Sequence, residues 1–384
     1  MVNDKIIYLD NAATSPIHPE VLKSYNEVSL QYFANASSIH GLGVRSNTLL
    51  NKAREQVLKY LSCHEHDCIF TSGATESNNL ALKGYAMQYK NRGKHIIVSR
   101  IEHPSVIETV HQLEKVYGFE VSYISVDSNG VINIDELKKE IRKDTILVSV
   151  MAVNNETGAI NPIHEISKII RKFPKIALHV DAVQAIGKIK FDFNDVDLVT
   201  ITGHKIHCVK GIGALIIKKK ISLMPTNCGG GQEDGLRSGT NDLAGAVAFA
   251  KAIRIAKEGK AKRFEYVSNL IKPLITYLYE NPDLYELNSN SELNPFIVNF
   301  SLKKHKASVL VEALSNEGIM VSSISACHSK GEKASYVIKE MGKDDNLSHN
   351  TIRISASEYN TQEEIEILII KLKELIEGIR ENAI

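Results

Sequence analysis

The middle of the chain, from about residue 67 to residue 218, alternates short apolar runs with stretches of helical periodicity. Apolar positions three and four residues apart predict helices, for example at 105–117, 135–143 and 164–172. The apolar runs predict seven strands, at 68–72, 95–99, 121–126, 146–151, 176–180, 198–202 and 214–218. Strands that alternate with helices in this way indicate an α/β fold with a mostly parallel sheet.

The pattern changes after about residue 260. A long helical stretch comes first, then a mixed region, and then a charged amphipathic stretch over 362–380 that predicts a helix. A chain of 384 residues exceeds the size at which a single hydrophobic core usually stops growing. We therefore expect a large α/β domain over residues 15–258 and a small α+β domain in which residues 1–14 join residues 259–384.

Composition narrows the classes of function. The formal net charge is +1, so electrostatics gives no argument for a nucleic-acid or membrane partner. No apolar run approaches the roughly 20 residues of a membrane span, and the first residues, M-V-N-D-K, lack a signal-peptide pattern. The five cysteines form no disulfide framework. We expect a protein of the reducing cytoplasm.

Two predicted strands end in groups that suit one cofactor. The run I-A-L-H-V-D ends in Asp181, and the strand at 198–202 leads into T-G-H-K, which ends in Lys205. An acid and a lysine after neighbouring strands are typical of a pyridoxal phosphate (PLP) site, where the lysine holds the cofactor as a Schiff base. The carboxylate of Asp181 stabilises the protonated pyridine ring, which acts as an electron sink. The sequence thus predicts carbanion chemistry on an amino acid.

Other polar residues follow predicted strands, and each has a plainer alternative. The turn T-S-G-A-T-E-S-N-N at 71–79 suits a phosphate, or is an ordinary strand-to-helix turn capped by Thr75 or Ser77. His103 suits ring stacking or acid–base work, or is a hydrogen-bonded loop residue. Asn155 and Gln184 can hydrogen-bond the phenolic oxygen of the cofactor, although turns favour such amides in any case.

Two loops carry further candidate chemistry. The glycine-rich stretch at 229–240 lets backbone approach a ligand closely, so Arg237 and Thr240 could meet an anion; the alternative is a flexible surface loop. Cys327 lies in S-S-I-S-A-C-H-S-K-G, among small and polar residues where a thiolate can act as a nucleophile. A lone cysteine is otherwise a small apolar residue.

A compact group of cysteines and histidines invites a metal-site interpretation. It comprises Cys63, His64, His66 and Cys68. Cys68, however, begins a predicted strand that buries it, and no second pair follows at zinc-finger spacing. We therefore expect no metal site.

Taken together, these segments resemble the cysteine desulfurase family, the NifS/IscS-like branch of the class V aminotransferase group. The resemblance runs nearly from end to end. It is carried by Y-L-D-N-A-A-T (8–14), N-A-S-S-I-H (35–40), F-T-S-G-A-T-E-S-N-N (70–79), E-H-P-S-V (102–106), V-N-N-E-T-G (153–158), H-V-D-A-V-Q-A-I-G-K (179–188), G-H-K (203–205), K-G-I-G-A-L (210–215), G-G-G-Q-E-D-G-L-R-S-G-T (229–240), S-A-C (325–327) and T-I-R-I-S (351–355). It implies the PLP-dependent transferase fold of type I.

The resemblance also implies a role for each matched residue. Lys205 would carry PLP and move the substrate α-proton, Asp181 would pair with the pyridine nitrogen, and His103 would stack on the ring. The residues implied around the rest of the site are Gln184 and Asn155 at the ring oxygen, Ala74, Thr75, Thr202 and His204 at the phosphate, Thr240 reaching that phosphate from the second subunit of a homodimer, and Asn35 and Arg353 at the substrate carboxylate.

The implied reaction converts L-cysteine to L-alanine. Cys327 matches the family's nucleophile and would keep the sulfur as a persulfide. A partner protein would receive it for iron–sulfur cluster assembly or tRNA thiolation. Two rivals stay open: a selenocysteine lyase or another PLP β-eliminating enzyme, which need not use Cys327, and a partner-dependent paralogue that binds PLP but turns over slowly.

The chain departs from the family pattern at several positions. The family usually has proline where Ala36, Val209 and Ala334 stand. It usually has glycine in place of Ile324, which as a β-branched residue does not readily adopt positive φ, so we expect the cysteine loop to follow a different path. It usually has Gly-Arg in place of Ser357-Glu358, a loss of positive charge that predicts weaker substrate binding or dependence on a partner.

Overall fold

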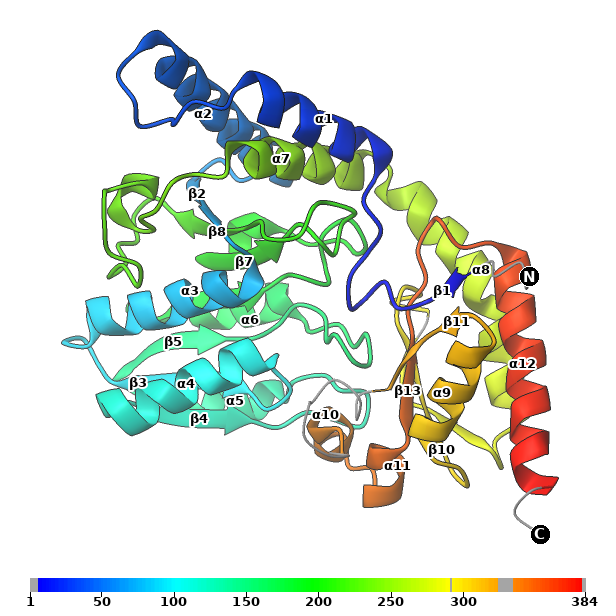
Figure 1. Cartoon of the computed structure of the whole chain (residues 1–384). Helices are drawn as coiled ribbons and strands as arrows, with labels where there is room; N and C mark the ends of the chain where they lie inside the picture. The colour runs from blue at the N-terminus through cyan, green and yellow to red at the C-terminus, as the bar shows by residue number, and fades with distance from the viewer. Residues whose placement is uncertain (1–5, 291, 324–333, 382–384) are drawn as a thin grey trace.

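A seven-stranded sheet forms the centre of the larger part of the protein (Figure 1). This computed structural model describes residues 6–290, 292–323 and 334–381, without the side chains of residues 379–381. The strands are β2 (His66–Thr71), β3 (His95–Ser99), β4 (Glu120–Ile124), β5 (Thr145–Ser149), β6 (Ala177–Asp181), β7 (Leu198–Thr202) and β8 (Gly213–Lys218). They lie in the order β2-β8-β7-β6-β5-β3-β4, and β8 alone runs antiparallel to its neighbours. The mostly parallel seven-stranded sheet expected from the sequence is confirmed.

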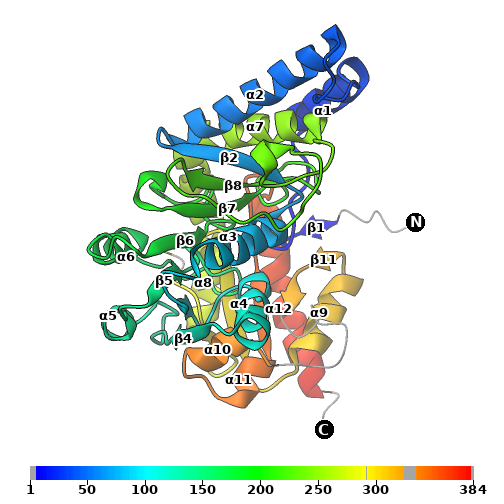
Figure 2. The same cartoon turned by 90° about the vertical axis from the view of Figure 1, so that its left-hand side faces the viewer.

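Helices cover both faces of this sheet, as Figure 2 shows. One face packs against α3 (Ala74–Tyr89) and α4 (Pro104–Tyr117). The other packs against α1 (Pro19–Gln31), α2 (Gly41–Leu61), α5 (Ile134–Glu140), α6 (Ile163–Ile170) and α7 (Leu243–Glu258). Alternation along the strands feeds both cores: in β8, Ala214 and Ile216 belong to one core, and Leu215 and Ile217 to the other. A strand buried on both faces reads as a continuous apolar run, which is why the sequence predicted it.

The smaller part has its own core and its own sheets. A four-stranded antiparallel sheet has the order β12 (Ser322–Ser323), β13 (Thr351–Ile354), β10 (Val298–Leu302) and β9 (Tyr285–Leu287). Its helices are α8 (Lys260–Glu280), α9 (Ala307–Asn316), α10 (Tyr336–Glu340), α11 (Asp345–His349) and α12 (Gln362–Glu381). No helix in the described ranges has the length and apolarity of a membrane span.

The N-terminal segment packs with this smaller part. Strand β1 (Ile7–Tyr8) pairs in parallel with β11 (Ile319–Met320). Ile7, Leu9 and Ala12 share a hydrophobic core with residues of α8 and α12. The limits 15–258 and 1–14 with 259–384 stay a prediction, and the packing of residues 7–12 agrees with them.

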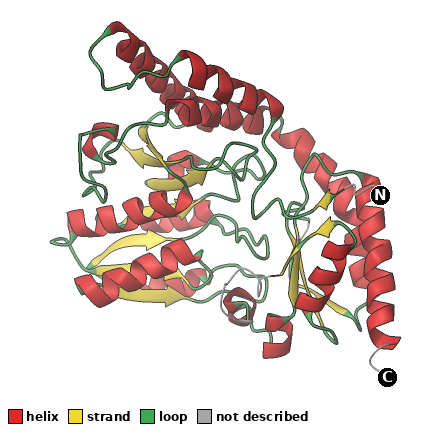
Figure 3. Ribbon diagram, in the orientation of Figure 1, coloured by secondary structure: helices red, strands yellow, loops and turns green. Residues whose placement is uncertain are grey.

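The loops that follow the parallel strands turn toward the smaller part (Figure 3). Ligands of open α/β sheets bind outside the carboxyl ends of the strands. Residues contributed by β6, β7 and α3 on one side, and by β13 on the other, therefore meet at the junction of the two parts.

Candidate active site

A cavity of about 860 Å³ lies at this junction. Ten of the thirteen residues that the sequence singles out as site residues line it: Ala74, Thr75, His103, Asn155, Asp181, Gln184, Thr202, His204, Lys205 and Arg353. They come from segments spread over more than two thirds of the chain, and only the fold brings them together. The cavity also has lining residues that sequence reasoning missed, among them Ala12, Ala13, Glu156, Lys210 and Tyr336.

Lys205 lies three residues beyond the end of β7, against the N-terminal segment. Its Nζ donates to the carbonyl oxygens of Ala12 and Ala13, each 2.5 Å away. The backbone of Ser15 donates to the carbonyl of His204, which ties the same segment to the lysine turn. The motif that contains Ala12 and Ala13 thus holds the lysine amine at the cavity. The sequence did not reveal this role, because backbone carbonyls of two alanines make the contacts.

Asp181 ends β6 and is held from two sides. Its Oδ2 accepts a hydrogen bond from Asn78 Nδ2 at 2.9 Å, and its Oδ1 accepts one from the backbone of Val183 at 3.0 Å. The residue is only 5% exposed. A carboxylate with fixed orientation beside a cavity suits a cationic ring nitrogen.

His103 caps the first turn of α4. Its Nδ1 accepts from the backbone of Ser105 at 3.1 Å and lies 2.8 Å from the Ser105 hydroxyl. Burial lowers the pKa of His103, Asp181 raises it in part, and Lys205 lowers it further. A neutral imidazole is the form these surroundings favour.

The start of α3 is suited to a phosphate. Gly73, at φ +148°, gives α3 no side-chain cap, so the first N–H groups of the helix are available to an anion. A Cβ on Gly213 would lie 2.8 Å from the Cα of Gly73, so this close approach requires glycine. Burial and the positive charges of Lys205, Lys210 and Lys188 lower the pKa of His204 to about 4. Cationic surroundings and open N–H groups together fit a phosphate dianion.

Arg353 reaches the cavity from β13 of the smaller part. Its Nη2 lies 2.8 Å from Asp10 Oδ1, and its Nη1 donates to the backbone carbonyl of Asn155 at 2.9 Å. Its Nε is buried and has no hydrogen-bond partner among the described residues. A planar fork held in this way can receive a carboxylate.

Gln184 is engaged within the chain. Its Nε2 donates to the carbonyl of Ala12 at 3.0 Å, and its Oε1 accepts from Lys188 Nζ at 2.7 Å. Burial, together with the charges of Lys205 and Arg353, lowers the pKa of Lys188 to about 7. Gln184 is therefore oriented by a second lysine that the sequence did not single out.

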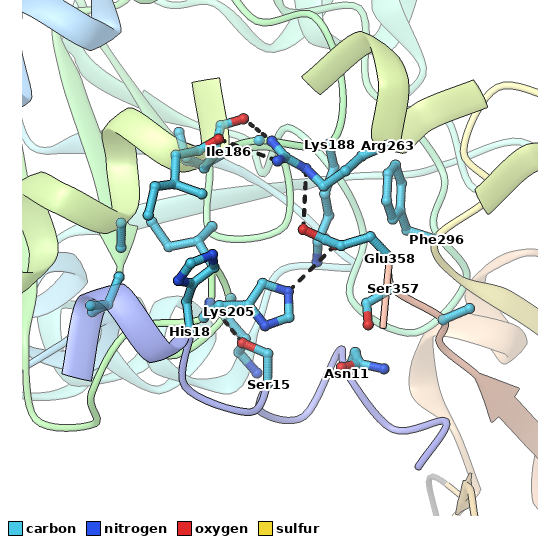
Figure 4. Close-up of a pocket in the computed structure, with 18 residues that line it drawn as sticks. Asn11, Ser15, His18, Ile186, Lys188, Lys205, Arg263, Phe296, Ser357 and Glu358 are labelled. Atoms are coloured by element: carbon cyan, nitrogen blue, oxygen red, sulfur yellow. Dashed lines mark hydrogen bonds and ion pairs between the residues drawn. The ribbon is translucent and has the colours of Figure 1, made fainter. Parts of the chain in front are cut away.

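A small cavity of about 40 Å³ lies behind Lys205, and it contains the Ser357-Glu358 departure (Figure 4). Glu358 lies 3.6 Å from His207 Nε2 and 3.6 Å from Arg263 Nε. Burial opposes ionisation of Glu358, but His207 and Arg263 hold its pKa below the usual value. Glu358 lines this rear cavity and not the larger one beside Arg353. His207 and Arg263 therefore balance the negative charge of Glu358 in the rear cavity, and Glu358 does not face the main cavity that Arg353 lines.

Two expected site residues, Asn35 and Thr240, do not line the cavity in the described chain, and a third lies outside the described residues. Asn35 is exposed in the loop between α1 and α2, where its Oδ1 accepts from the backbone of Ser37. Thr240 is exposed just before α7. Cys327 lies outside the described residues, as does Ile324.

Three of the other four cysteines belong to the hydrophobic core, and the fourth, Cys228, is exposed. Cys63, Cys68 and Cys208 are buried. Burial raises the pKa of Cys63 and of Cys208 to about 12, and raises that of Cys68 still further. Across the described ranges, no three histidine, cysteine or carboxylate side chains are grouped so that they could hold a metal ion.

Comparison with known proteins places the chain in a family. It matches the family model described as aminotransferase class V over residues 7–368. It is 39% identical over 377 residues to the cysteine desulfurase IscS of Dictyoglomus turgidum, and the aligned region covers 97% of this chain and 95% of that protein. It is 40% identical over 380 residues to the mitochondrial cysteine desulfurase of Saccharomyces cerevisiae, which covers 98% of this chain and 76% of that protein.

Solved structures agree with this. A structure described as a NifS-like protein has a TM-score of 0.90 and 36% identity, covering 97% of this chain and 100% of that one. A NifS-like protein from Rickettsia africae has a TM-score of 0.86 and 29% identity, covering 97% of this chain and 99% of that one. The resemblance seen in the sequence is confirmed: the chain belongs to the class V aminotransferase family and, within it, to the NifS/IscS-like cysteine desulfurases.

Proposed function

We propose that this protein uses pyridoxal phosphate to convert L-cysteine to L-alanine and passes the sulfur to an acceptor. The observation that carries the proposal is the convergence of Lys205, Asp181, the uncapped start of α3 and Arg353 on one cavity. An amine, an acid, an anion site and a second cation are the groups that a phosphorylated pyridine and an amino acid require together. Membership of the cysteine desulfurase family names the amino acid.

The side chains present fit the cofactor. Lys205 would hold its aldehyde carbon, Asp181 its ring nitrogen, and His103 its ring face. The first turn of α3, with Thr75, Thr202 and His204, would hold the phosphate, and Asn155 and Gln184 would contact the ring oxygen. When bound, PLP withdraws the electron pair left at the substrate α-carbon.

The other steps are assigned to side chains of this protein. Arg353 binds the substrate carboxylate with its fork. Lys205 takes the α-proton and, as the conjugate acid, returns a proton to carbon. Exclusion of water by the two packed parts strengthens both interactions.

Cys327 is proposed as the nucleophile. Ser322 and Tyr336, which flank the stretch that contains Cys327, both line the cavity, and Ser322 pairs with Arg353 across the sheet. The Cys327 thiolate forms a bond to the substrate sulfur, and the C–S bond breaks with its electrons going to carbon. Protonation of that carbon gives alanine, and the protein keeps a persulfide.

A homodimer is part of the proposal. Leu30, Phe33 and Ile39, at and near the α1–α2 loop, are 79%, 76% and 98% exposed, which is a large apolar surface for a single chain. Asn35 and Thr240 are also exposed. Burial of this surface by a second copy would bring Thr240 to the phosphate of the neighbouring site and engage Asn35.

The acceptor and the compartment complete the proposal. We infer a cytoplasmic enzyme that delivers sulfur to a scaffold for iron–sulfur clusters or to a tRNA-thiolating protein. The described cysteines are free thiols, which suits a reducing compartment.

The test is anaerobic turnover of L-cysteine with dithiothreitol, scoring alanine and sulfide together. We expect equal amounts of both from the wild type and neither from Cys327→Ala. Cys63→Ala, at a buried thiol that does not line the cavity, is the matched control and should keep full turnover. If Cys327→Ala still forms alanine, the result favours a lyase. A yellow wild-type protein that makes no alanine would contradict the proposal that the enzyme acts without a partner.

A further inference from the structure

Four side chains beneath the cavity form one chain of hydrogen bonds. Asn78 Nδ2 lies 2.9 Å from Asp181 Oδ2 and 2.9 Å from Ser105 Oγ. Ser105 Oγ in turn lies 2.8 Å from His103 Nδ1. Asn78 is fully buried, and Ser105 and Asp181 are buried as well. The chain therefore links the acid at the end of β6 to the histidine at the start of α4 through the first turns of α3 and α4.

The donors in this chain can be assigned. Asn78 must present its NH₂ group, because the opposite orientation would set its oxygen against the Asp181 carboxylate. Within the described residues, Asn78 Oδ1 is buried without a hydrogen-bond partner. An unpaired buried acceptor is unfavourable, so the two bonds made by Nδ2 must outweigh it.

The same logic fixes the proton on His103. The Ser105 hydroxyl accepts from Asn78, so its own hydrogen is directed to His103 Nδ1. The backbone N–H of Ser105, which can only donate, is aimed at the same nitrogen at 3.1 Å. Nδ1 of His103 is thus an acceptor, and the ring proton is on Nε2.

The charged groups around His103 are few. Asp181 comes from β6 and Lys205 from the turn after β7, and they act on the pKa of His103 in opposite directions. Glu102 precedes it in the chain, and burial raises the pKa of Glu102 to about 8. Burial favours the neutral ring, so the hydrogen bonds at Nδ1 and the low-dielectric surroundings act together.

We propose that Asn78 and Ser105 are positioning residues for the reaction. They hold the Asp181 carboxylate in one orientation and keep His103 neutral, with Nε2–H as the group it offers to the cavity. The inference rests on the proposed function only in taking the occupant of the cavity to be PLP. It restricts His103 to donating a hydrogen bond or proton from Nε2, since Nδ1 is already occupied.

The alternative is a purely structural role, in which Asn78 and Ser105 only join α3 to α4. Such a role would leave the protonation of His103 unchanged in variants that still fold. A measurement of that protonation therefore separates the two interpretations.

The experiment follows the histidine ring nitrogens by NMR in the full-length holoenzyme labelled with ¹⁵N-histidine, with His103→Gln to assign the signals. In the wild type we expect His103 to carry its proton on Nε2 at neutral pH. Ser105→Ala removes one donor to Nδ1, so the ring should titrate at higher pH, by about half a unit or more. Ser105→Thr keeps the hydroxyl and should restore the wild-type titration.

A second arm measures the affinity for PLP by equilibrium dialysis. Asn78→Leu removes a hydrogen bond to the Asp181 carboxylate, and we expect PLP affinity to fall roughly tenfold or more. The matched control is Asn79→Leu, because Asn79 is the next residue of α3 and donates only to the carbonyl of Thr75 in the described chain. Its PLP affinity and His103 titration should equal those of the wild type.

The outcomes are distinct. A wild-type His103 protonated on Nδ1, or an unchanged His103 titration in Ser105→Ala, overturns the inference even if desulfuration is intact. If the NMR and PLP results are as expected but the protein makes no alanine from L-cysteine, the proposed function is wrong and this inference still holds. If Asn78→Leu does not fold, Ser105→Ala decides alone.

Discussion

Arg353, the residue proposed to bind the substrate carboxylate, already uses part of its hydrogen-bonding capacity within the chain. Asp10 and the carbonyl of Asn155 each occupy one terminal nitrogen of the guanidinium group. These contacts neutralise part of the positive charge of Arg353 at the cavity. They also restrict the rotation of a long side chain before a carboxylate binds. Preorganisation of this kind raises affinity because less entropy is lost on binding.

We expect Arg353→Lys to raise the KM for L-cysteine at least about tenfold, with a smaller change in kcat. A lysine keeps the charge but cannot keep the bond to Asp10 and still bind a carboxylate at two points. Steady-state kinetics of alanine formation provides the measurement, with Arg171→Lys, in a surface ion pair, as control. Equal KM values for wild type and Arg353→Lys would contradict the assignment of the substrate carboxylate.

Glu156 is a second residue whose environment has a measurable consequence. It lines the cavity and accepts a hydrogen bond from Ser335 at 2.5 Å. Burial raises its pKa to about 7, while Ser335 and Arg353 act in the opposite direction. Between its ordinary pKa of 4.5 and about 7, the folded protein therefore holds a proton that the unfolded chain has lost.

This proton makes stability depend on pH with a defined sign. The contribution is fully present below pH 4.5 and is lost as the pH rises through 7, a loss on the order of 3 kcal/mol. Glu156→Gln keeps an acceptor for Ser335 and does not titrate, so it should gain stability relative to the wild type between pH 5 and pH 8. Urea unfolding at both pH values measures this, with the exposed Glu165→Gln as control. If Glu156→Gln and the wild type differ in stability by the same amount at pH 5 and at pH 8, Glu156 is not the source of the pH dependence.

At the scale of elements, two ion pairs anchor the glycine-rich loop at 229–240: Arg237 pairs with Glu76 of α3, and Glu233 forms the more buried pair with α2. Arg54 of α2 contacts both carboxylate oxygens of Glu233, at 2.7 and 3.1 Å. Glu233, whose side chain is 1% exposed, also accepts from the backbone of Phe70 and from Asn241. The glycines do not leave this loop free, because Glu233 connects it to α2 and to β2. Glu233 also bonds Asn241, the residue that follows Thr240.

We expect Arg54→Met to destabilise the protein by about 3 kcal/mol or more, since it leaves a buried carboxylate without its partner. Arg142→Met, which breaks an exposed pair with Glu120 and Asp144, is the control and should change the stability far less, because solvent screens an exposed pair. Urea unfolding measures both. The double variant Arg54→Met with Glu233→Gln should regain part of the loss; if it does not, the charge of Glu233 is not the cause.

At the scale of the whole molecule, two hydrophobic cores meet at the cavity. One surrounds the seven-stranded sheet, and the other joins residues 7–12 to α8 and α12. Because Lys205 and Asp181 belong to the first part and Arg353 to the second, the geometry of the site depends on how the parts pack. Two of the seven phosphate and carboxylate contacts expected from the family, Thr240 and Asn35, are exposed in one chain.

We expect Phe33→Glu and Ile39→Glu together to shift the protein from dimer to monomer, because they place charge in an apolar interface. Light scattering coupled to size-exclusion chromatography measures the mass, and PLP content tests the proposed contact of Thr240 with the phosphate in the neighbouring site. Leu293→Glu, at an exposed apolar residue of the smaller part, is the control and should stay dimeric. A wild type that elutes as a monomer would overturn the dimer outright.

The amino-acid sequence by itself determined the strands of the large sheet and the class of that sheet, and its local pattern located two of the candidate site residues. Strands buried on both faces appear as continuous apolar runs, and Asp181 and Lys205 can be located because they follow such runs directly. Backbone and long-range contacts leave no such local pattern. Only the tertiary structure placed the carbonyls of Ala12 and Ala13 on Lys205, turned Glu358 toward Arg263, and joined Asn78 to Asp181 across 103 residues, because those contacts depend on how separate elements pack.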